Sequence, residues 1–403
     1  MVKIAILGFG TVGSGVAEVI EENADSIARR AANEIGVKYI LKRKQLPDSP
    51  FADKIIHDFS IIEKDPEIQV MVECIGGLDA AYDYTKRCLM AGKSVVTSNK
   101  ELVATKGHEL IAIAKEKNVN YLFEASVGGG IPIIRPITQC LAANEIDEIY
   151  GILNGTTNYI LTKMIQFGAS FEQALKQARD NGFAEKDPTD DIEGHDSCRK
   201  ICILSALCFG RHVYPHQVPT RGISGVTRSD VEYARHLGYK IKLLGRALRT
   251  GKDTITAYVA PHLINKTSLL SNVDGVMNGI VVHGNAIGEA IFYGAGAGKL
   301  PTASAVVADV IDAVKHFKAR KYLDWEDSVP GYVTDSDELP SRWYVRTGAS
   351  LEEIGRAFGN VKFISYPEAD PGEYAFATRE MTGHQLKSLI NGMEVRSVFR
   401  ILD

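Results

Sequence analysis

The 403-residue sequence is poor in the features that mark secreted, membrane and nucleic-acid-binding proteins. It has only six cysteines and no CxxC pair, which argues against a disulfide framework and leaves reduced, mostly buried thiols as the expectation. No window reaches the ~18 apolar residues needed to span a bilayer. The formal net charge of −4 provides no general attraction for nucleic acid or membranes. We therefore expect a cytoplasmic protein whose partners are small molecules.

Length and composition indicate a folded protein of more than one domain. A chain of 403 residues exceeds the usual size of a single core. Its composition, 45% hydrophobic and 24% charged, is that of a globular protein. From changes in pattern along the chain we predict a first domain over 1–130, a mixed α+β domain over 131–300 and a small third domain over 341–403.

The first 130 residues or so alternate between short apolar runs and amphipathic stretches. The run Val2–Leu7 leads into a glycine-rich turn and an amphipathic stretch that continues to about Ala32. Strand-like and helix-like runs then alternate, which predicts an α/β fold with a doubly wound parallel sheet of the Rossmann type. The expected strands are Val37–Leu41, Val70–Ile75, Ser94–Thr97 and Asn120–Phe123, and the expected helices lie around Tyr82–Met90 and Lys106–Lys117.

The rest of the chain has longer segments and a separate C-terminal pattern. A helix-like run over Asp191–Phe209 stops at Gly210, a residue that suits a C-cap. A further helix is expected over 301–318 and is predicted to pack back on the first domain. The acidic stretch Asp324–Pro340 is predicted to be a linker. From Arg342 the pattern is strand, helix, strand, strand, helix, strand, which is the ferredoxin-like order.

A glycine-rich motif follows the first expected strand and opens the first helix. Its residues are Gly8, Phe9, Gly10, Thr11, Val12 and Gly13, a GxGxxG pattern in the context that marks dinucleotide binding. We expect Gly8 to allow the tight turn, Gly10 to let the backbone approach a pyrophosphate, and Gly13 to let helix and strand pack closely. Free amides at the helix N-terminus favour phosphate groups. The sequence therefore predicts a dinucleotide cofactor.

A basic cluster stands at the end of the second expected strand. NAD-specific sites usually carry an acidic residue there, which binds the adenosine ribose. Here the residues are Lys42, Arg43 and Lys44. Cationic side chains can pair with a 2′-phosphate, so we expect NADP(H) in preference to NAD(H). The alternative is a solvated surface cluster unrelated to the cofactor.

The densest group of ionisable residues lies between Asn181 and Lys200, where an acidic loop leads into an apolar helix. Asp196 and Lys200 are i and i+4 neighbours and share one face of that helix. A semiburied lysine held by a carboxylate can donate a proton to the alkoxide that forms during carbonyl reduction, and can take it back in the reverse direction. The alternative is an ordinary helix ion pair of about 0.3–0.5 kcal/mol.

Six motifs in register, spread over roughly residues 1–318, resemble those of the homoserine dehydrogenase family. They are GFGTVG from Gly8, SNKELVA from Ser98, EASVGGGIPII from Glu124, NGTTNYI from Asn154, GFAEKDPTDDIEGHDSCRK from Gly182 and GAGAGKLPTASAVVAD from Gly294. The resemblance implies a nicotinamide-dependent oxidoreductase that interconverts L-aspartate 4-semialdehyde and L-homoserine. This reaction belongs to the pathway to threonine, methionine and isoleucine.

The resemblance also implies roles for individual side chains. Lys200 would be the proton donor and acceptor, and Lys100 would be a second catalytic lysine close to the nicotinamide and the substrate. Glu185 and Asp196 would bind the substrate, with Asp191 supporting them. Under this expectation the second domain is the catalytic and dimerisation domain, and the first is the dinucleotide-binding domain.

Backbone positions are implied in the same way. Gly182 and Gly298 would approach the cofactor closely, which a residue without a side chain permits. A monovalent cation, usually sodium, would be held mainly by backbone carbonyls, those of Glu124, Val127, Gly129 and Ile131. On the residues alone, a glycine-rich hinge is the alternative to this cation site. We also expect a homo-oligomer, either a dimer or a dimer of dimers.

The third domain resembles an ACT domain, a module that binds an end-product amino acid in many enzymes of amino-acid metabolism. ACT ligand sites usually use a loop with an Asp, Pro and Gly run after the first strand. This chain has Thr347, Gly348, Ala349 and Ser350 there instead. Two roles therefore stay open, regulation by an amino acid such as threonine and a structural, dimer-forming role.

Two other functions are compatible with parts of the pattern. A different amino-acid dehydrogenase on the same scaffold would share GxGxxG and a lysine pair, but the NGTTNYI and DPTDD motifs argue against it. A catalytically silent nucleotide sensor would be expected to lack Lys100 or Lys200, and both are present. The expectation is therefore an active homoserine dehydrogenase.

Overall fold

The computed structural model describes residues 1–318 and 323–402, and the chain divides into two compact units. The expected division into three domains stays a prediction. No helix in the described part of the chain is long and apolar enough to cross a membrane. The first unit comprises Met1–Glu145, Cys202–Pro215 and Gly294–Ser328, and the second comprises Ile146–Ile201, His216–Tyr293 and Val329–Asp403.

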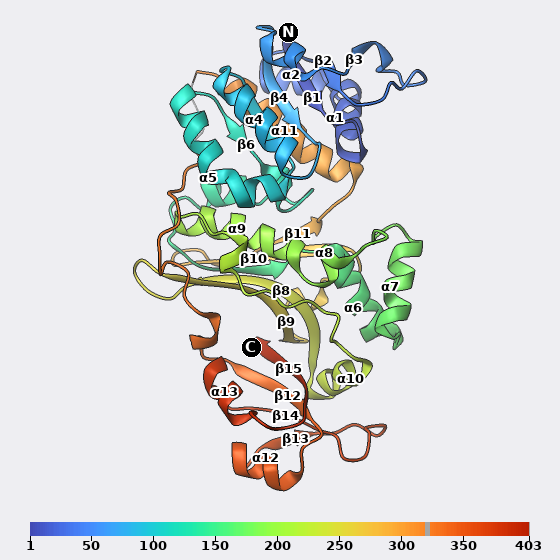
Figure 1. Cartoon of the computed structure of the whole chain (residues 1–403), viewed down its shortest axis with the longest axis vertical. Helices are drawn as coiled ribbons and strands as arrows, with labels where there is room; N and C mark the ends of the chain where they lie inside the picture. The colour runs from blue at the N-terminus through green and yellow to red at the C-terminus, as the bar shows by residue number, and fades with distance from the viewer. Residues whose placement is uncertain (319–322, 403) are drawn as a thin grey trace. The chain divides into compact units, whose positions relative to one another are not determined.

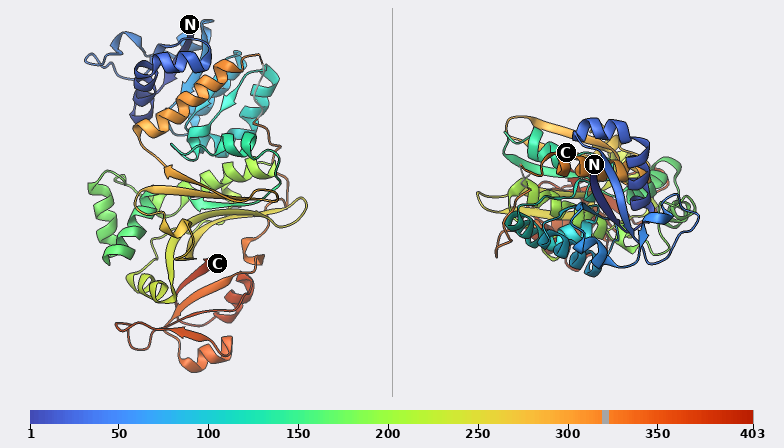
Figure 2. Two further views of the ribbon diagram at one scale, coloured as in Figure 1. Left: turned by 180° about the vertical axis from the view of Figure 1, so that it is seen from behind. Right: turned by 90° about the horizontal axis from the view of Figure 1, so that it is seen from above.

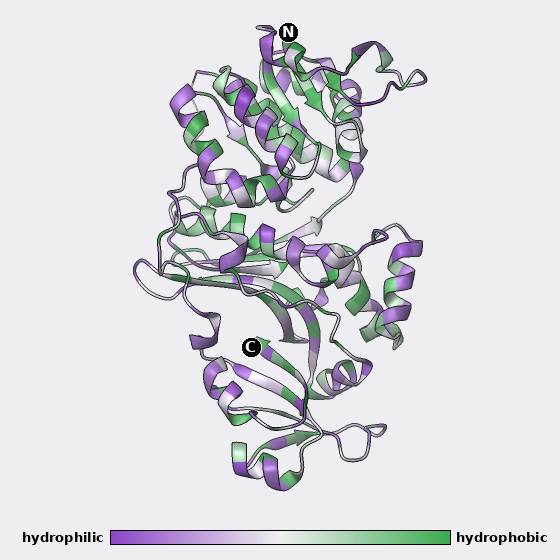
Figure 3. Ribbon diagram, in the orientation of Figure 1, coloured by the Kyte–Doolittle hydropathy of each residue, from purple (hydrophilic) through white to green (hydrophobic). Residues whose placement is uncertain are grey.

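The first unit contains a six-stranded parallel sheet in the order β3-β2-β1-β4-β5-β6 (Figure 1). This is the strand order of a Rossmann fold, so the predicted doubly wound parallel sheet is confirmed. Helices cover both faces of the sheet, which favours apolar strands, and Figure 3 shows these strands largely in green. The strands are β1 (Val2–Leu7), β2 (Ile35–Leu41), β3 (Ile55–Ile56), β4 (Ile68–Glu73), β5 (Ser94–Thr97) and β6 (Tyr121–Leu122).

One helix of this unit comes from late in the chain. Helix α11 packs on α1 and brings Ala303, Val306 and Val310 into one apolar cluster with Ile4 and Ile6 of β1. Figure 2 shows α11 in orange, running across the blue N-terminal segments. The helices of the unit are α1 (Thr11–Glu22), α2 (Ala24–Ala31), α3 (Phe59–Lys64), α4 (Asp79–Met90), α5 (Lys100–Lys117) and α11 (Lys299–Lys315).

Three local details differ from the expected elements of the first unit. The amphipathic stretch to about Ala32 was expected to be continuous, but it breaks at Asn23 into α1 and α2. The backbone of Asn23 leaves the helical region there, with φ −106° and ψ 20°. No element was expected in the stretch that contains the short elements β3 and α3. The late helix is Lys299–Lys315, so it begins two residues and ends three residues earlier than the expected 301–318.

The second unit is built on a nine-stranded sheet in the order β11-β10-β7-β8-β9-β15-β12-β14-β13. The long hairpin of β8 and β9 is paired in register from Tyr239 with Asn265 to Arg249 with Ile255. Helix α9 begins in this unit and ends in the first. The strands outside the C-terminal segment are β7 (Ile146–Ile152), β8 (Tyr239–Arg249), β9 (Ile255–Asn265), β10 (Met277–Gly284) and β11 (Gly288–Ala295). The helices are α6 (Gly155–Phe167), α7 (Phe171–Asp180), α8 (Thr189–Ile192), α9 (His195–Phe209) and α10 (Arg228–Leu237).

The C-terminal segment follows the expected order of strands and helices. Its own strands lie in the order β15-β12-β14-β13, which is the antiparallel arrangement of ferredoxin-like folds. Strand β15 also pairs in parallel with β9, Arg400 facing His262, so this segment continues the sheet of the rest of the unit. Its elements are β12 (Arg342–Thr347), α12 (Leu351–Phe358), β13 (Lys362–Ile364), β14 (Tyr374–Ala377), α13 (Gly383–Leu389) and β15 (Val395–Leu402).

A buried histidine in β9 predicts acid sensitivity. His262 is fully buried, hydrogen-bonds to the Ala260 carbonyl at 2.9 Å, and lies close enough to Arg246 and Arg400 to feel their charge. Burial, followed by the charge of Arg246, lowers its pKa from 6.5 to about 3. The unfolded chain therefore binds more protons between pH 6.5 and 3, so the free energy of unfolding falls as the pH falls through that window.

Replacing His262 with glutamine is expected to flatten this dependence. The wild-type protein should lose up to ~1.4 kcal/mol more per pH unit than His262→Gln between pH 6.5 and 4. Denaturant unfolding of both proteins at a series of pH values measures the difference. The control is His283→Gln, because the His283 side chain is 49% exposed. Parallel pH profiles for wild type and His262→Gln would contradict the prediction.

Candidate active site

Two of the three motif glycines are required by close backbone packing. Gly8 has a φ of +89°, and a Cβ atom there would lie 2.6 Å from the Cys74 carbonyl oxygen. A Cβ atom at Gly13 would lie 2.0 Å from the Gly8 carbonyl oxygen. At Gly10 a Cβ atom would meet nothing within 4 Å, so the space beside the N-terminus of α1 is open. This geometry fits a pyrophosphate approaching at Gly10.

A cavity of about 460 Å³ opens beside this turn, within the first unit. It reaches from the glycine turn to the basic cluster at the end of β2, where Arg43 and Lys44 are exposed. The Lys42 ammonium donates to the Phe9 carbonyl at 3.1 Å and so ties the cluster to the turn. The cavity is lined by Gly8, Phe9, Gly10, Leu41, Lys42, Arg43, Lys44, His57, Cys74, Ile75, Ala80 and Tyr84. The predicted cofactor residues of the turn and the basic cluster thus share one cavity.

A buried carboxylate organises the turns that follow β4 and β5. Glu73 is fully buried and accepts hydrogen bonds from the Ile75 amide and the Thr97 hydroxyl, both at 2.6 Å. The Thr97 hydroxyl in turn accepts from the Asn99 backbone amide at 2.9 Å, and the Asn99 side chain caps α5. Burial raises the pKa of Glu73, although these hydrogen bonds oppose the rise. Lys100 is half-buried and is the first residue of that helix, so this hydrogen-bond network fixes the position of its backbone.

Lys200 and Asp196 pair on one face of α9, the face that their helical spacing predicted, and the pair is buried. The Lys200 ammonium lies 2.8 Å from an Asp196 carboxylate oxygen and donates to the Leu153 carbonyl, also at 2.8 Å. The two side chains are only 9% and 4% exposed. The side chains of an exposed helix pair would move freely in solvent. This ammonium is instead held in one position by two hydrogen-bond acceptors. Such a group can hold a proton at a defined position beside a reacting oxygen.

The pair is anchored to a second helix through Asn154. Its amide nitrogen donates to Asp191 at 2.7 Å and to Asp196 at 2.9 Å. Its amide oxygen accepts from the Thr157 backbone at 2.8 Å and so caps α6. One residue of the NGTTNYI motif therefore joins two of the predicted substrate-binding carboxylates to a helix N-terminus. The structure brings Asp191, Asp196 and Lys200 together.

The loop before α9 differs in part from the expected helix. The run from Asp191 to Phe209 was expected to be continuous, but it is interrupted at Gly194, whose φ is +85°. A left-handed glycine ends α8 and lets the chain turn into α9. Glu185 lies exposed in the loop between α7 and α8, and Gly182, with a φ of +73°, lies near its start.

The remaining predicted site residues belong to the first unit. Gly298, with a φ of +130°, immediately precedes α11. The Glu124 carboxylate accepts the backbone amides of residues 133–135 at 2.7 to 2.9 Å, so its side chain fixes the chain that follows the glycines. Any contribution of Glu124 to a cation would come from its carbonyl. The sodium site at Glu124, Val127, Gly129 and Ile131 stays a prediction.

Comparison with known proteins decides the family. Residues 8–124 match the family model of the homoserine dehydrogenase NAD-binding domain, and residues 132–311 match that of homoserine dehydrogenase. A homoserine dehydrogenase from Pseudomonas aeruginosa is 44% identical over 84% of this chain and 77% of its own length. The chain belongs to the homoserine dehydrogenase family. A second homoserine dehydrogenase, from Neisseria gonorrhoeae, is 42% identical over 87% of this chain and 82% of its own.

Solved structures support the same family. A homoserine dehydrogenase from Thiobacillus denitrificans superposes with a TM-score of 0.92 at 37% identity, over 100% of this chain and 98% of that one. A hyperthermophilic archaeal homoserine dehydrogenase in complex with NADPH superposes with a TM-score of 0.66 at 29% identity, over 77% of this chain and 97% of its own. The predicted function as a homoserine dehydrogenase is confirmed, and the rival dehydrogenase and sensor hypotheses are not supported.

Two residues that shape this homoserine dehydrogenase site were given no role on sequence grounds. Asn154 was quoted only as part of a motif, although Asn before Gly-Thr-Thr is a recognisable helix N-cap. Glu73 could have been noticed as a carboxylate that ends an apolar strand just before two glycines. Their partners could not have been predicted, because each reaches residues more than 20 positions away.

Proposed function

We propose that this enzyme reduces L-aspartate 4-semialdehyde reversibly to L-homoserine with NADP(H) in preference to NAD(H). The observation that carries the proposal is the buried Lys200 ammonium, held by Asp196 and the Leu153 carbonyl. A nicotinamide cofactor supplies the hydride when it is bound. Lys200 gives its proton to the carbonyl oxygen as negative charge develops there, and takes the hydroxyl proton in the oxidation of homoserine.

The other site residues orient the substrate in this proposal. Glu185 and Asp196 bind the substrate, Asp191 supports them, and Lys100 is the second lysine beside the reacting carbon. Asn154 fixes Asp191 and Asp196 relative to α6, so it acts as a positioning residue. Sodium at the carbonyls of the Glu124–Ile131 segment and a homodimer, or a dimer of dimers, complete the proposal.

A steady-state assay tests the proposed reaction and its cofactor. Purified protein is given aspartate semialdehyde with NADPH or NADH, and the loss of reduced-nicotinamide absorbance is followed. We expect turnover with both substrate and cofactor present and a higher kcat/KM for NADPH. Absence of turnover with either cofactor would overturn the proposed function, and a higher kcat/KM for NADH would overturn the preference alone.

The basic cluster makes the cofactor preference testable by substitution. Arg43→Asp is expected to lower kcat/KM for NADPH at least about tenfold, because a charge-assisted contact to the 2′-phosphate is lost and a repulsion is gained. The value for NADH should change less, since a carboxylate can accept hydrogen bonds from the ribose. Arg29→Asp, an exposed site in the last turn of α2, is the matched control. An equal loss with both cofactors would contradict the assignment.

The C-terminal segment supports a second candidate function, that of an ACT-like domain. Its support is the ferredoxin-like strand order and the continuation of the sheet through β15 and β9. The loop after β12 is tied to the start of β15, since the Gly348 amide and the Thr347 hydroxyl both donate to the Glu394 carbonyl, at 2.9 and 2.7 Å. This packing favours the structural role over a ligand site in that loop.

Threonine added to the same assay distinguishes the two roles. Because the loop after β12 lacks the Asp, Pro and Gly run of ACT ligand sites, we expect the rate to change less than about twofold at millimolar threonine, with unchanged KM values. Serine is the control for non-specific effects. Inhibition by threonine alone, saturating with concentration, would overturn the structural role and establish feedback regulation.

A further inference from the structure

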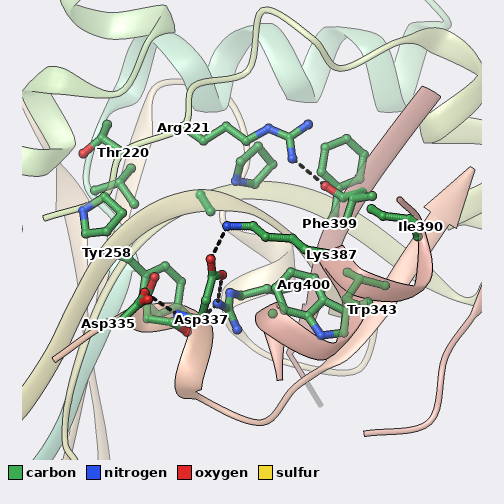
Figure 4. Close-up of a pocket in the computed structure, with 18 residues that line it drawn as sticks. Thr220, Arg221, Tyr258, Asp335, Asp337, Trp343, Lys387, Ile390, Phe399 and Arg400 are labelled. Carbon is green, nitrogen blue, oxygen red and sulfur yellow. Dashed lines mark hydrogen bonds and ion pairs between the residues drawn. The ribbon is translucent and has the colours of Figure 1, made fainter. Parts of the chain in front are cut away.

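A cavity of about 350 Å³ lies within the second unit, away from Lys200 in the sequence and formed by other elements (Figure 4). One wall is the segment Pro219–Arg221 together with β9, and the opposite wall is the C-terminal segment. Its lining residues are Pro219, Thr220, Arg221, Tyr258, Val259, Ala260, Pro261, Asp335, Ser336, Asp337, Trp343, Gly383, Leu386, Lys387, Ile390, Val398, Phe399 and Arg400.

The charges around this cavity favour an anion. Its lining carries the cations Arg221, Lys387 and Arg400 against the carboxylates Asp335 and Asp337. Both Lys387 and Arg400 are directed at Asp337, Arg400 at 3.5 Å, so that carboxylate is already neutralised. Asp337 is thus paired with Lys387 and Arg400, whereas Arg221, which is exposed, donates to a backbone carbonyl.

A metal ion is a poorer occupant of the same region. Asp335, Asp337 and His384 form a group whose ligand atoms lie within 4.8 Å of one another. The Lys387 ammonium nevertheless pairs with one Asp337 oxygen, and His384 hydrogen-bonds to Asp335 at 3.0 Å. A cation bound there would have to displace these partners and would lie beside an ammonium group.

Arg221 is the cation best placed to receive an anion. One of its terminal nitrogens donates to the Val398 carbonyl at 2.7 Å, and its guanidinium lies 5.4 Å from the centre of the Phe399 ring. These contacts fix the guanidinium at the rim of the cavity, as Figure 4 shows, while a fork of five donors has further bonds to give. Arg400, by contrast, already donates to Ser336 and Ser341 at 2.7 Å each.

The remaining walls are apolar and aromatic. The Arg400 guanidinium lies 4.9 Å from the ring centre of Tyr258 and 4.2 Å from that of Trp343. The two aromatic rings therefore hold the guanidinium in place. Leu386 and Ile390 of the α13 region contribute aliphatic surface on the other side. Such walls suit a compact apolar body better than a strongly hydrated group.

The Arg221 wall is connected to the loop that precedes the Lys200 helix. The Arg221 amide donates to the Val259 carbonyl at 2.9 Å, and a Cβ at the next residue, Gly222, would lie 1.9 Å from the Ile192 carbonyl oxygen. The Ile223 amide donates to that same oxygen at 2.8 Å. The segment 221–223 thus contacts the backbone at Ile192, four residues before Asp196, which would give a displacement of Arg221 a direct route toward the start of α9.

The geometry points to an effector site in this cavity for a small monocarboxylate with an apolar body, its carboxylate on Arg221 and Lys387 and its body against Trp343 and Ile390. Binding changes turnover by shifting the segment 220–223 and, through it, the start of α9. This coupling rests on the proposed catalytic role of Lys200, whereas the binding itself does not. α-Amino acids, 2-oxo acids and simple fatty acids all have a carboxylate and an apolar body, and the test below distinguishes these three classes of ligand.

Titration calorimetry on the full-length protein tests the binding. The probes are isovalerate, 2-oxoisovalerate and L-valine, with isovaleramide as the matched ligand that lacks the carboxylate. We expect saturable binding of at least one acid, with isovaleramide at least about tenfold weaker. The acid that binds most tightly identifies the source. No saturable heat with any of the three acids at millimolar concentration, or equal binding of the amide, would overturn the proposal.

Two variants locate the site. Arg221→Gln removes the charge, and Ile390→Trp fills the cavity from the α13 side, so each is expected to weaken binding of the preferred acid at least about tenfold. Arg356→Gln, an exposed arginine of the same C-terminal segment, should bind as the wild type does. Thermal unfolding shows that each variant is folded. Unchanged binding in both Arg221→Gln and Ile390→Trp would overturn the assignment of the site.

Hydrogen exchange tests the coupling separately from turnover. Saturation with the bound acid is expected to change amide exchange in residues 192–200 and 220–223 of the wild type, and in neither segment of Arg221→Gln. Binding with no change in residues 192–200 would overturn the coupling and leave the ligand site in place. An enzyme inactive towards aspartate semialdehyde would overturn the proposed function, while the calorimetric result would still stand.

Discussion

Lys200→Ala is expected to lower kcat by roughly a hundred- to ten-thousandfold, the range that a positioned acid–base group contributes. Alanine leaves no group to donate a proton to the oxygen of aspartate semialdehyde or to accept one from homoserine. Water or hydroxide would then have to transfer the proton, without a side chain at position 200 to orient it. Steady-state kinetics in both directions measure the loss.

Cofactor binding separates a chemical defect from a structural one. The glycine turn and the basic cluster belong to the first unit, whereas Lys200 belongs to the second. The fluorescence of NADPH titrated with Lys200→Ala should therefore give a Kd within about threefold of the wild type. Arg199→Ala is the matched control, because it removes a neighbouring cation of the same helix whose partner is Asp190. Turnover of Lys200→Ala within a few-fold of the wild type would contradict the proposed role.

The surroundings of Lys200 also decide between the two interpretations of its spacing from Asp196. An exposed i,i+4 pair contributes about 0.3–0.5 kcal/mol and needs no further partner. Here the ammonium also donates to the Leu153 carbonyl, and the Asp196 carboxylate also accepts from Asn154. Sequence spacing could place Lys200 and Asp196 on one face but could not show that this face is buried. The proposed function of the pair is therefore supported by the tertiary contacts and not by the spacing alone.

The Rossmann sheet was the part of the fold best predicted from the sequence. Its strands are continuous apolar runs because they are buried on both faces, and the glycine motif fixed where the first turn lies. The C-terminal segment also has the order of strands and helices that was expected from Arg342 onward. Local patterns of this kind report burial directly.

Features that depend on distant partners could not be predicted. The pairing of β15 with β9 joins residues more than 130 positions apart, and no pattern in either strand specifies the other. The interruption at Gly194 has a similar cause, because a Cβ atom there would lie 3.1 Å from Thr220 and 3.2 Å from Val259. Glycine at this position satisfies a packing requirement set by another part of the unit, which the sequence alone does not display.

Arg346→Met is expected to lower the free energy of unfolding of the second unit by about 3–5 kcal/mol, because it leaves buried carboxylates without their cation. Arg346 is 7% exposed and lies 2.7 Å from both Asp230 and Glu373, whose side chains are 0% and 1% exposed. Arg396 still pairs with Glu373 in the variant, so the larger share of the loss falls on Asp230.

Tryptophan fluorescence can follow this unit by itself. The sequence has two tryptophans, and Trp325 belongs to the first unit whereas Trp343 lies in β12, the strand that carries Arg346. Denaturant unfolding in a Trp325→Phe background therefore reports the second unit through Trp343. Arg356→Met, which removes an arginine that is 73% exposed, should change stability by less than about 1 kcal/mol. Equal midpoints for Arg346→Met and its parent would contradict the prediction.

A double substitution identifies the cause of the loss. If the unpaired charge of Asp230 is responsible, Asp230→Asn should recover part of the stability lost in Arg346→Met, because a neutral amide can be buried at lower cost than a carboxylate. Ser397 and Tyr344 still offer hydroxyl groups to residue 230, at 3.0 and 3.2 Å in the wild type. Additive losses in the two single variants would instead assign the effect to packing. A coupling of at least about 1 kcal/mol would show that the arginine stabilises the junction of α10 with the C-terminal sheet by compensating charge.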